Sequence, residues 1–358
     1  MRLMIVTHNM AGGGTERVIA RLLRYFVRAG DSCTLVTECA GPSFYALPEA
    51  VERLSLLEGP HIGYRYLPRA YLRLRRLVKA RRPDMVLAMP EKVNVWTVLS
   101  LMGTGVPVVV SERNDPKRHP ENRLKRLLRR LVYPMAAGFI FQTDMAAACF
   151  PARIRARGAV LDNPLDTSRM PPANTGARGR TVVGAGRLEP QKNFSLLIEA
   201  FARFFAAHPD WRLVIYGEGR ERGALEARAR ALLPPDAWSM PGQTEALDAA
   251  LLQAGMFVLS SDFEGMPNAL IEAMALGAPC VAADCRAGGP AALIRDGENG
   301  LLTPAGDPAA MAAAMARAAD DAPLRRQLSR NAEQIRLRLD EALVCGQWRS
   351  YLGKHIRG

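Results

Sequence analysis

Histidine and cysteine are scarce in this 358-residue sequence, and neither forms a metal-binding pattern. There are five histidines and six cysteines, and the cysteines stand at positions 33, 39, 149, 280, 285 and 345. None of their spacings matches the cysteine pairs or Cys–His sets that hold zinc. We therefore expect reduced, buried thiols in a cytosolic protein and no metal site.

Long hydrophobic runs are also missing. The least polar stretch, residues 93–110, carries no charge, but Gly103, Gly105 and Pro107 divide it. This pattern predicts a helix, a turn and a buried strand rather than a membrane span. The opening MRLMIVTHNM has too short an apolar run for a signal core and no cleavage site, so we expect a cytoplasmic protein.

The positive charge is concentrated in the first half of the sequence. Residues 1–170 contain 27 Lys and Arg against 14 Asp and Glu, whereas residues 171–358 contain 21 of each. Two segments, 65–82 and 113–130, hold eight basic residues apiece. Few aromatic residues accompany them and no known nucleic-acid-binding module is present, so we expect no nucleic acid. A basic nucleic-acid-binding protein is kept as an alternative.

The second basic segment has the pattern of an amphipathic helix. Leucines recur at helical spacing, with basic residues elsewhere on the wheel; the leucines are Leu124, Leu127, Leu128 and Leu131. Such a helix gains about 1 kcal/mol per Lys or Arg close to an anionic leaflet. Two interpretations stay open: the leucines can pack on the domain's own core, or the helix can face an anionic membrane. Both can hold, since the helix can dock by its leucines and present its arginines outward.

Strand-like and helix-like segments alternate along the whole chain. Apolar runs such as RLMIVTH and PDMVLAM are separated by helical segments, which indicates parallel strands with crossover helices. The pattern restarts at position 181, after the Pro- and Gly-rich segment 163–180, which we interpret as a linker. The sequence predicts two doubly wound, Rossmann-like α/β domains, residues 1–165 and 166–332, facing across a cleft.

Three glycines at positions 12–14 separate the first predicted strand from the first predicted helix. Glycine lets a ligand approach the backbone, and a helix N-terminus offers partial positive charge to a phosphate. The spacing matches neither the dinucleotide fingerprint nor the Walker loop. A plain tight turn and a phosphate-approaching turn at Gly13 and Gly14 therefore both remain open.

The second half repeats this arrangement with charges. GAGRLEPQKNF places Arg187 and Lys192 after a predicted strand, where two cations can hold a diphosphate. WRLVIYGEG ends the next strand near Gly217. The carboxyl ends of parallel strands share one edge of a sheet, so both loops are expected there. An ordinary solvated loop is the alternative.

Two glutamates lie eight positions apart in SSDFEGMPNALIEAMALG. Glu264 falls in a predicted loop, and Glu272 falls in a helix that Pro267 begins, in its first turn, and Gly277 ends. A loop carboxylate can accept hydrogen bonds from sugar hydroxyls, and a helix carboxylate can accept the paired hydroxyls of a ribose. The alternative is a turn residue and a solvated helix residue.

Taken together, these motifs resemble the family 4 retaining glycosyltransferases, which have the GT-B fold. The resemblance rests on GGGTER, GAGRLEPQKNF, YGEG, SSDFEGMPNALIE, ALGAPCVAADCRAGGP and IRDGENGLLTP, and runs from about residue 5 to 306. It implies transfer of a sugar from a nucleoside diphosphate, with the first domain receiving the acceptor. It also implies that the final helix, residues 333–352, returns to the first domain.

The resemblance assigns roles to individual residues. Glu264, Arg187 and Lys192 would be catalytic, with Glu264 on the donor sugar and the two cations on the leaving diphosphate. Glu272 would bind the ribose, and the remaining donor contacts would come from Gly13, Gly14, Gly217, Gly265, Met266, Pro267 and Asn268.

The sequence departs from the family at one position. Many relatives carry a histidine in the first domain where Arg113 stands here. The group that accepts the acceptor's proton is therefore open; the acceptor-side candidates are His8, Glu16, Glu112, Arg113, Asp115 and His119.

The predicted activity is transfer of a hexose or N-acetylhexosamine, with retention of configuration, to a lipid-linked or growing surface glycan. UDP is favoured over GDP, and neither a metal nor a cofactor is expected, because no D-x-D motif occurs where a donor would sit. The expected partners are the nucleotide sugar, a polyprenyl-diphosphate-linked glycan and the anionic inner face of the cell membrane. A nucleotide-sugar enzyme of the same fold without transfer, such as an epimerase, is the alternative.

Overall fold

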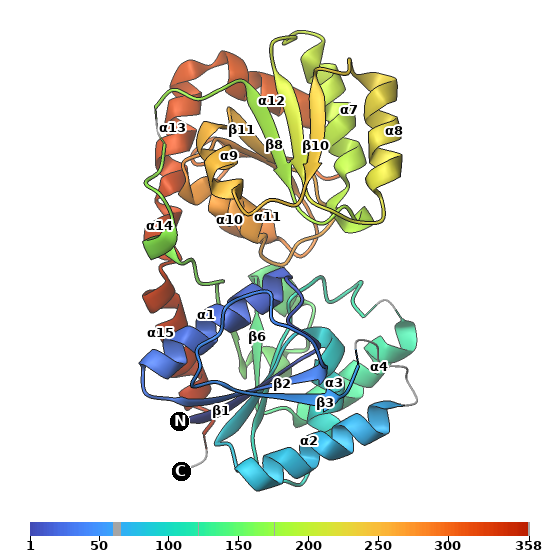
Figure 1. The fold of residues 1–358 in the computed structure, drawn as a ribbon, viewed down its shortest axis with the longest axis vertical. Coiled ribbons are helices and arrows are strands. Elements are labelled where there is room, and N and C mark those ends of the chain that lie inside the picture. Colours follow the sequence, from blue (N-terminus) through green and yellow to red (C-terminus); the bar gives the residue numbers. More distant parts are fainter. Residues whose placement is uncertain (60–65, 121, 175, 357–358) are drawn as a thin grey trace. The chain divides into compact units, whose positions relative to one another are not determined.

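The protein was analysed as a computed structural model that describes residues 1–59, 66–120, 122–174 and 176–356. The chain forms two compact units (Figure 1). The first unit contains Met1–Pro164 and Leu339–Gly358, and the second contains Leu165–Arg338. This boundary lies one residue before the predicted one, and the segment predicted to return to the first domain begins to do so at Leu339 rather than at 333.

The first unit is built on a seven-stranded parallel sheet with the order β3-β2-β1-β4-β5-β6-β7. Its strands are β1 (Arg2–Thr7), β2 (Ser32–Cys39), β3 (Glu52–Leu57), β4 (Met85–Ala88), β5 (Val108–Ser111), β6 (Gly138–Phe141) and β7 (Gly158–Val160). Its helices are α1 (Gly14–Arg28), α2 (Leu67–Arg81), α3 (Glu91–Leu101), α4 (Arg123–Val132), α5 (Asp144–Ala148), α6 (Ala152–Arg155) and α15 (Glu341–Gly353).

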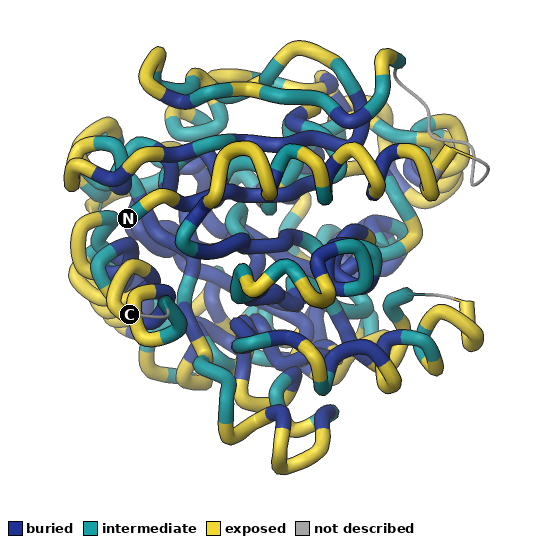
Figure 2. Tube along the Cα trace, turned by 90° about the horizontal axis from the view of Figure 1, so that it is seen from below, coloured by how far each residue is buried: buried dark blue, intermediate teal, exposed yellow. Residues whose placement is uncertain are grey.

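Helices cover both faces of this sheet, which explains why its central strands are apolar throughout. In β1, Leu3 and Ile5 belong to the core that contains residues of α1 and α15. Met4 and Val6 point to the other face and belong to the core beneath α2 and α3. In Figure 2 the interior strands are dark blue and the outer turns of the helices are yellow.

The last helix completes the core of the first unit. Trp348 of α15 is fully buried, and its indole N–H donates to the carbonyl oxygen of Asp162 at 3.0 Å. The Tyr351 hydroxyl accepts from the amide of Phe139 at 2.8 Å and donates to the carbonyl oxygen of Arg157 at 2.6 Å. Helix α15 therefore joins the ends of β6 and β7 to the first unit's core.

The second unit is a six-stranded parallel sheet with the order β10-β9-β8-β11-β12-β13. Its strands are β8 (Thr181–Ala185), β9 (Arg212–Tyr216), β10 (Trp238–Gly242), β11 (Met256–Leu259), β12 (Cys280–Asp284) and β13 (Leu301–Pro304). Its helices are α7 (Phe194–Phe205), α8 (Arg222–Leu232), α9 (Leu247–Gln253), α10 (Asn268–Ala275), α11 (Gly289–Leu293), α12 (Pro308–Asp320), α13 (Ala322–Glu333) and α14 (Ile335–Arg338). The two doubly wound sheets confirm the predicted α/β fold class.

The boundary between the two units, Pro164 to Leu165, falls inside the segment 163–180 that we interpreted as a linker, but the later part of this segment packs against the second unit. Arg178 donates to the carbonyl oxygens of Leu251 at 2.8 Å and Leu276 at 2.7 Å, and Asn174 donates to that of Leu252 at 2.8 Å. These bonds hold the segment against the second unit. The proline and glycine content correctly predicted an irregular backbone, but composition alone cannot distinguish a free segment from one packed against a domain.

Each sheet reverses its strand order at one place, where ligands of doubly wound sheets commonly bind. In the second unit the reversal lies between β8 and β11, and in the first unit it lies between β1 and β4. A ligand site is therefore expected in the loops that follow these four strands.

Candidate active site

In the second unit, backbone packing fixes the loop that follows β8. Gly217 has a φ of 144°, and a Cβ atom built on it would lie 1.8 Å from the carbonyl oxygen of Gly186. Only glycine fits this approach, which brings the loops after β8 and β9 into contact. Asn193 then caps α7 and donates to Asp262 at 2.8 Å, which ties the β8 loop to the β11 loop.

Lys192 and Glu264 form a direct ion pair across this strand reversal. The Lys192 Nζ atom lies 2.6 Å from Oε1 of Glu264, and the Ser261 hydroxyl donates to the same oxygen at 2.8 Å. The side chains are 16% and 8% exposed, so water screens the pair weakly. Two of the three residues predicted to be catalytic therefore lie together, each fixing the orientation of the other.

Arg187, the third predicted catalytic residue, differs from Lys192. Its side chain is exposed, and it makes no ion pair within the described part of the chain. It stays in the same loop, between β8 and the 3-10 turn Pro190–Lys192, so the structure places a second, unneutralised cation beside the paired one.

The helix that follows Glu264 begins one residue later than predicted. Pro267 precedes α10 as its N-terminal cap, rather than lying in the first turn, and Asn268 is the first helical residue. Gly277, with a φ of 71°, ends the helix as predicted. Glu272 is buried, which contradicts the alternative of a solvated helix residue.

A third loop closes on the Glu264 loop. The amide of Glu264 donates to the carbonyl oxygen of Arg286 at 3.1 Å, and the amide of Gly289 donates to that of Glu264 at 3.2 Å. A Cβ atom on Gly289 would lie 2.3 Å from the carbonyl oxygen of Gly265. Gly265, Met266 and Pro267 are consequently buried beneath this contact, which fixes the backbone that the sequence assigned to donor binding.

In the first unit, the glycine turn leads directly into α1. Gly12 has a φ of 107°, Gly13 caps the helix and Gly14 is its first residue. A Cβ atom on Gly13 would lie 2.2 Å from Oε2 of Glu16, so this carboxylate folds back over the start of the helix. A carboxylate is favourable there because the helix dipole presents positive charge.

His8 directly follows β1 and is the partly exposed end of a polar chain whose other members, Glu38 and Tyr71, are buried. Its Nδ1 atom is 2.7 Å from Oε2 of Glu38, and the Tyr71 hydroxyl donates to the other carboxylate oxygen. Burial, with the charge of Glu38, raises the pKa of Tyr71 well above its ordinary value. Glu38 therefore orients His8 from behind.

Glu112 lies at the end of β5 and is engaged inside the first unit. Arg129 of α4 lies 3.2 Å from its Oε2 atom, and the Tyr133 hydroxyl donates to Oε1. Burial raises the pKa of Glu112, while Arg129 opposes that rise. Arg129 also donates to the carbonyl oxygens of His119 at 2.8 Å and Pro116 at 2.6 Å, so this network shapes the segment after β5.

Of the other candidates, Asp115 is buried and accepts from the amide of Lys117 at 2.8 Å. Arg113 donates from Nη2 to Oδ1 of Asn163 at 2.5 Å, and its guanidinium lies 5.9 Å from the ring centroid of Trp348. Its Nε and Nη1 atoms are buried and have no partner among the described residues. Burial lowers the pKa of Arg113 to about 10, against the opposing charges of Glu91 and Glu16.

Two family models match the chain and together account for most of it. The model described as Glycosyltransferase Family 4 matches residues 12–169, and that described as Glycosyl transferases group 1 matches residues 171–335. The chain belongs to glycosyltransferase family 4. The family resemblance inferred from its motifs is therefore confirmed.

The similarity to known proteins covers nearly the whole length of this glycosyltransferase. An N-acetyl-D-galactosaminyltransferase of Campylobacter jejuni, named for an undecaprenol-diphosphate-linked glycan, is 25% identical over 93% of both chains. The crystal structure of Anabaena HepE with UDP and glucose covers 99% of both chains with a TM-score of 0.84 and 18% identity, which shows the GT-B fold. An exopolysaccharide phosphotransferase of Streptomyces coelicolor is 35% identical, but the match covers 48% of this chain and 18% of that protein.

Sequence reasoning missed one residue of this glycosyltransferase, Glu91. It is the first residue of α3, separated by two residues from the end of β4 at the strand reversal of the first unit, and it is 6% exposed. Its Oε2 atom has no hydrogen-bond partner among the described residues, and burial raises its pKa. The sequence could have indicated this residue. Glu264 was selected because it is a charged residue just past a predicted strand, and Glu91 is likewise a charged residue just past the predicted strand PDMVLAMP.

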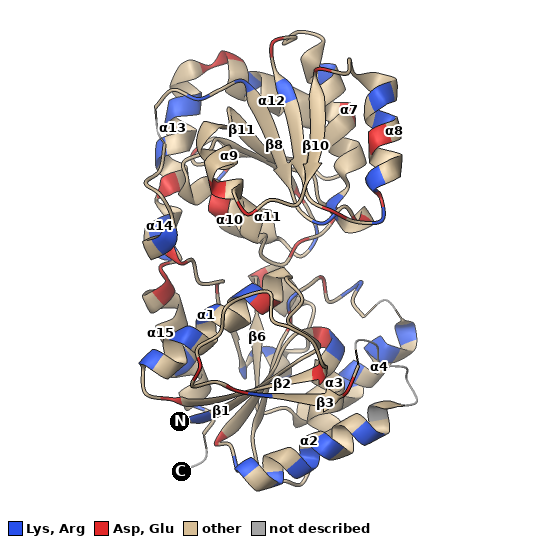
Figure 3. Ribbon diagram, viewed as in Figure 1, with Lys and Arg blue, Asp and Glu red and all other residues tan. Residues whose placement is uncertain are grey.

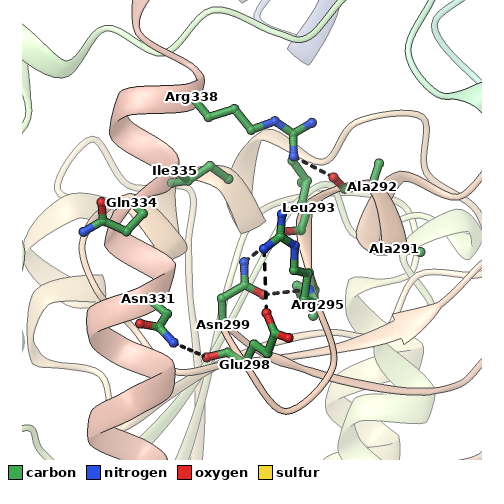
Figure 4. Close-up of a pocket in the computed structure, with 11 residues that line it drawn as sticks. Ala291, Ala292, Leu293, Arg295, Glu298, Asn299, Asn331, Gln334, Ile335 and Arg338 are labelled. Carbon is green, nitrogen blue, oxygen red and sulfur yellow. Dashed lines mark hydrogen bonds and ion pairs between the residues drawn. The ribbon is translucent and has the colours of Figure 1, made fainter.

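A surface pocket of about 450 Å³ lies elsewhere in the second unit of the glycosyltransferase, beside α11 and α13 (Figure 4). Its polar groups mostly bond to one another: Asn331 donates to the carbonyl oxygen of Glu298 at 2.8 Å, and Arg338 to that of Ala292 at 2.8 Å. None of the predicted site residues lines it. These bonds attach α13 to the loop after α11 and α14 to α11 itself, which is a structural role.

Neither a metal-binding cluster nor a membrane-spanning helix occurs among the described residues. No group of three or more His, Cys, Asp or Glu side chains gathers in a way that could hold a metal ion. No helix in the described ranges is both long and apolar enough to cross a bilayer.

Proposed function

We propose that this glycosyltransferase moves a hexose or N-acetylhexosamine from a UDP-sugar to a hydroxyl of a lipid-linked or growing surface glycan. Transfer retains the anomeric configuration and requires neither a metal nor a cofactor. The observation that carries the proposal is the buried Lys192–Glu264 pair, which lies at the strand reversal of the second unit beside the start of α10.

Lys192 is suited to hold the departing diphosphate. An ammonium group has three N–H donors, and Glu264 takes one of them at 2.6 Å. The remaining donors can bind phosphate oxygens as negative charge develops on them. A cation already held in place needs little reorganisation during the reaction, which is the main source of such electrostatic stabilisation. Exposed Arg187 in the same loop supplies a second charge, so the two cations take the part that a metal ion plays in other enzymes.

Glu264 is proposed to bind the donor sugar rather than to attack it. Its Oε1 atom already accepts from Lys192 and Ser261, so this oxygen is engaged in hydrogen bonds rather than free to attack a sugar carbon. Glu272, buried in α10, is proposed to accept the ribose hydroxyls. With no carboxylate acting as nucleophile, retention follows from attack by the acceptor on the face that the diphosphate leaves.

The choice of substrates draws on similar proteins. Two Campylobacter jejuni transferases, 25% and 24% identical to this chain, are named for N-acetylgalactosamine transfer to diphospho-undecaprenol-linked glycans. The Anabaena structure of the same fold holds UDP and glucose. We therefore infer a UDP-sugar donor and an acceptor carried on a polyprenyl diphosphate.

Helix α4 supports a membrane location for such an acceptor. Its surface is the reverse of an ordinary amphipathic helix, because Arg129 is buried at 6% exposure while three leucines face outward. Leu124, Leu127 and Leu131 are 71%, 52% and 65% exposed, and only Leu128 packs against the core. Of the two interpretations of these leucines, packing on the domain's own core is therefore wrong for three of the four.

Basic residues surround these leucines and extend along α2 (Figure 3). Arg65 and Glu121 of the two basic segments lie outside the described residues. Exposed leucine among exposed lysine and arginine matches a bilayer with anionic headgroups, since apolar burial and charge attraction then add. We propose that the first unit binds the cytoplasmic face of the cell membrane through α4.

The activity is tested with a panel of UDP- and GDP-sugars and a short polyprenyl-diphosphate-linked oligosaccharide ending in an N-acetylhexosamine. We expect one UDP-sugar to give a product with retained configuration by nuclear magnetic resonance, at a rate that EDTA does not change. An inverted product, loss of activity in EDTA, or donor turnover that ignores the acceptor would each refute the corresponding part of the proposal.

The membrane contact is tested by co-sedimentation with vesicles. Leu124, Leu127 and Leu131 replaced together by serine should weaken binding to anionic phosphatidylglycerol vesicles at least tenfold, given about 1.5–3 kcal/mol for each leucine that is fully buried. The matched control replaces Leu232, Leu337 and Leu343, which are equally exposed but lie outside α4. Equal binding to neutral and anionic vesicles, or an equal loss in the control, would exclude the proposed surface.

A further inference from the structure

The strand reversal of the first unit holds polar atoms that the protein leaves unbonded. Glu91 follows β4, and Arg113 follows the neighbouring strand β5. Oε2 of Glu91 and the Nε and Nη1 atoms of Arg113 are buried and have no hydrogen-bond partner among the described residues. Each unsatisfied buried group costs about 1–3 kcal/mol of stability. Several unsatisfied buried polar groups close together are typical of a site that a ligand completes.

Pairing of the two strands brings their carboxyl ends together. Ala88 of β4 is opposite Val110 of β5, so Glu91 and Arg113 each lie three residues beyond paired positions. Asn94 of α3 donates to the carbonyl oxygen of Ser111 at 2.9 Å and to the Tyr133 hydroxyl at 3.1 Å, which fixes the start of α3 against β5. The backbone around Glu91 is thus rigid.

The two opposite charges influence each other without touching. Each lowers the cost of the other's charge: Glu91 opposes the fall in the Arg113 pKa, and Arg113 opposes the rise in the Glu91 pKa. Within the described chain, however, no ion pair of 4.0 Å or less joins them. Arg113 is instead held from behind by Asn163 at 2.5 Å and lies against Trp348.

The chemistry of the unbonded atoms selects the ligand. Glu91 offers an acceptor and Arg113 offers two donors, so one group that both donates and accepts satisfies both residues. A hydroxyl does this. A phosphate cannot donate to Glu91 and would meet the negative charges of Glu91 and Glu16.

We propose that Glu91 and Arg113 bind one hydroxyl of the acceptor sugar, Glu91 accepting its hydrogen and Arg113 donating to its oxygen. This inference rests on the proposed glycosyl transfer and names a pair of residues that selects and orients the acceptor. The lipid diphosphate of the acceptor binds elsewhere, because this pair matches a neutral group.

The test uses the full-length protein, the polyprenyl-diphosphate-linked oligosaccharide, and analogues that each lack one hydroxyl of its terminal sugar. Glu91→Ala and Glu91→Gln should raise the KM for this acceptor about 10- to 100-fold, the cost of a hydrogen bond to a charged group, and leave the KM for the UDP-sugar unchanged. One deoxy analogue should show the same loss with the wild-type protein and no further loss with Glu91→Ala.

Stability distinguishes this role from a structural one. Glu91→Ala removes a buried carboxylate with an unbonded oxygen, which offsets the lost attraction for Arg113, so its Tm should stay close to that of the wild type. The control Asp31→Asn removes a buried, fully bonded carboxylate before β2, at the opposite edge of the sheet, and should lower Tm without changing the acceptor KM. An unchanged acceptor KM in both Glu91 variants, a clear fall in their Tm, or no matching deoxy analogue overturns the inference while transfer stands. If the wild-type protein transfers no sugar to any acceptor, the proposed function falls and this inference falls with it.

Discussion

The two units share one topology, but they treat the charges at their strand reversals in opposite ways. In the second unit, Lys192 and Glu264 neutralise each other at 2.6 Å and Ser261 adds a further bond. In the first unit, Glu91 and Arg113 influence each other's pKa without forming an ion pair and leave three polar atoms unbonded among the described residues. Both arrangements are buried and both lie where α/β sheets bind ligands.

This difference matches the two kinds of substrate that a transferase handles. The diphosphate is the same in every nucleotide sugar, so the cation that binds it can be fixed in advance by a permanent partner. An acceptor must be distinguished from other glycans, and unsatisfied groups reject a ligand that cannot bond them. We therefore expect rate to depend mainly on the second unit and selectivity on the first.

The largest effect is expected at the paired charges. Lys192→Ala and Glu264→Ala should each lower kcat about 10²- to 10³-fold or more, because each removes stabilisation of the transition state. The double variant should be hardly worse than either single one, since residues that act as a unit are not additive. Initial rates with saturating UDP-sugar measure this.

The control for this pair is Arg180→Ala, an exposed cation that precedes β8 at the opposite end of the strand. It should keep wild-type rates. Additive losses in the double variant would show that Lys192 and Glu264 work separately, and would remove the contrast between the units.

An intermediate effect is expected for stability within the first unit, where α4 carries two adjacent arginines. Arg129→Met leaves Glu112 buried without its cation and two carbonyl oxygens without their donor, which should cost about 3–5 kcal/mol of unfolding free energy. Arg130→Met changes an exposed side chain and should stay within about 0.5 kcal/mol. Urea denaturation measures both, and equal losses would show that Arg129 is not an anchor of α4.

The smallest effect is expected at the amino ends of the strands in the first sheet, where Asp31 pairs with Arg349. Burial raises the pKa of Asp31, but its hydrogen bonds, that to Arg349 foremost, outweigh burial and hold the pKa below its ordinary value of 3.8. A lowered folded pKa stabilises the protein above the unfolded pKa, and this contribution is lost as the pH falls through the folded value. Because Arg349 is 44% exposed, we expect only about 1 kcal/mol.

The comparison of wild type with Asp31→Asn by urea denaturation should show this difference at pH 7 and a shrinking difference below about pH 3.8. A difference that grows in acid would mean that the Asp31 carboxyl is stabilised in its protonated form.

Much of this architecture could be predicted from the sequence. Alternating apolar runs and helical segments gave both sheets, because parallel strands buried on two faces must be apolar. The Glu264 loop was predicted from Pro267 and Gly277, whose backbone preferences restrict where a helix begins and ends. Pro267 was still misplaced by one position, since proline fits both the cap and the first turn.

Three features could not be predicted because they depend on tertiary contacts. Periodicity placed Arg129 and the α4 leucines on different faces, but it cannot say which face turns inward. Arg129 turns inward because Glu112, from a strand end 17 residues earlier, needs a cation. The direct contact of Lys192 with Glu264 joins loops 72 residues apart, and the unbonded atoms of Glu91 become visible only when all neighbouring groups are placed.

Helix α15 has a consequence for folding while the protein is synthesised on the ribosome. The second unit is one continuous stretch, Leu165–Arg338, whereas the first needs Trp348 and Tyr351 from the end of the chain to close its core. The first unit is thus translated first but completes its fold last. Until α15 is made, the apolar surface that α15 covers beside β6 and β7 stays exposed. A nascent chain that stops before α15 would leave that surface open to chaperones and proteases, so synthesis of α15 is the step that closes the core of the first unit.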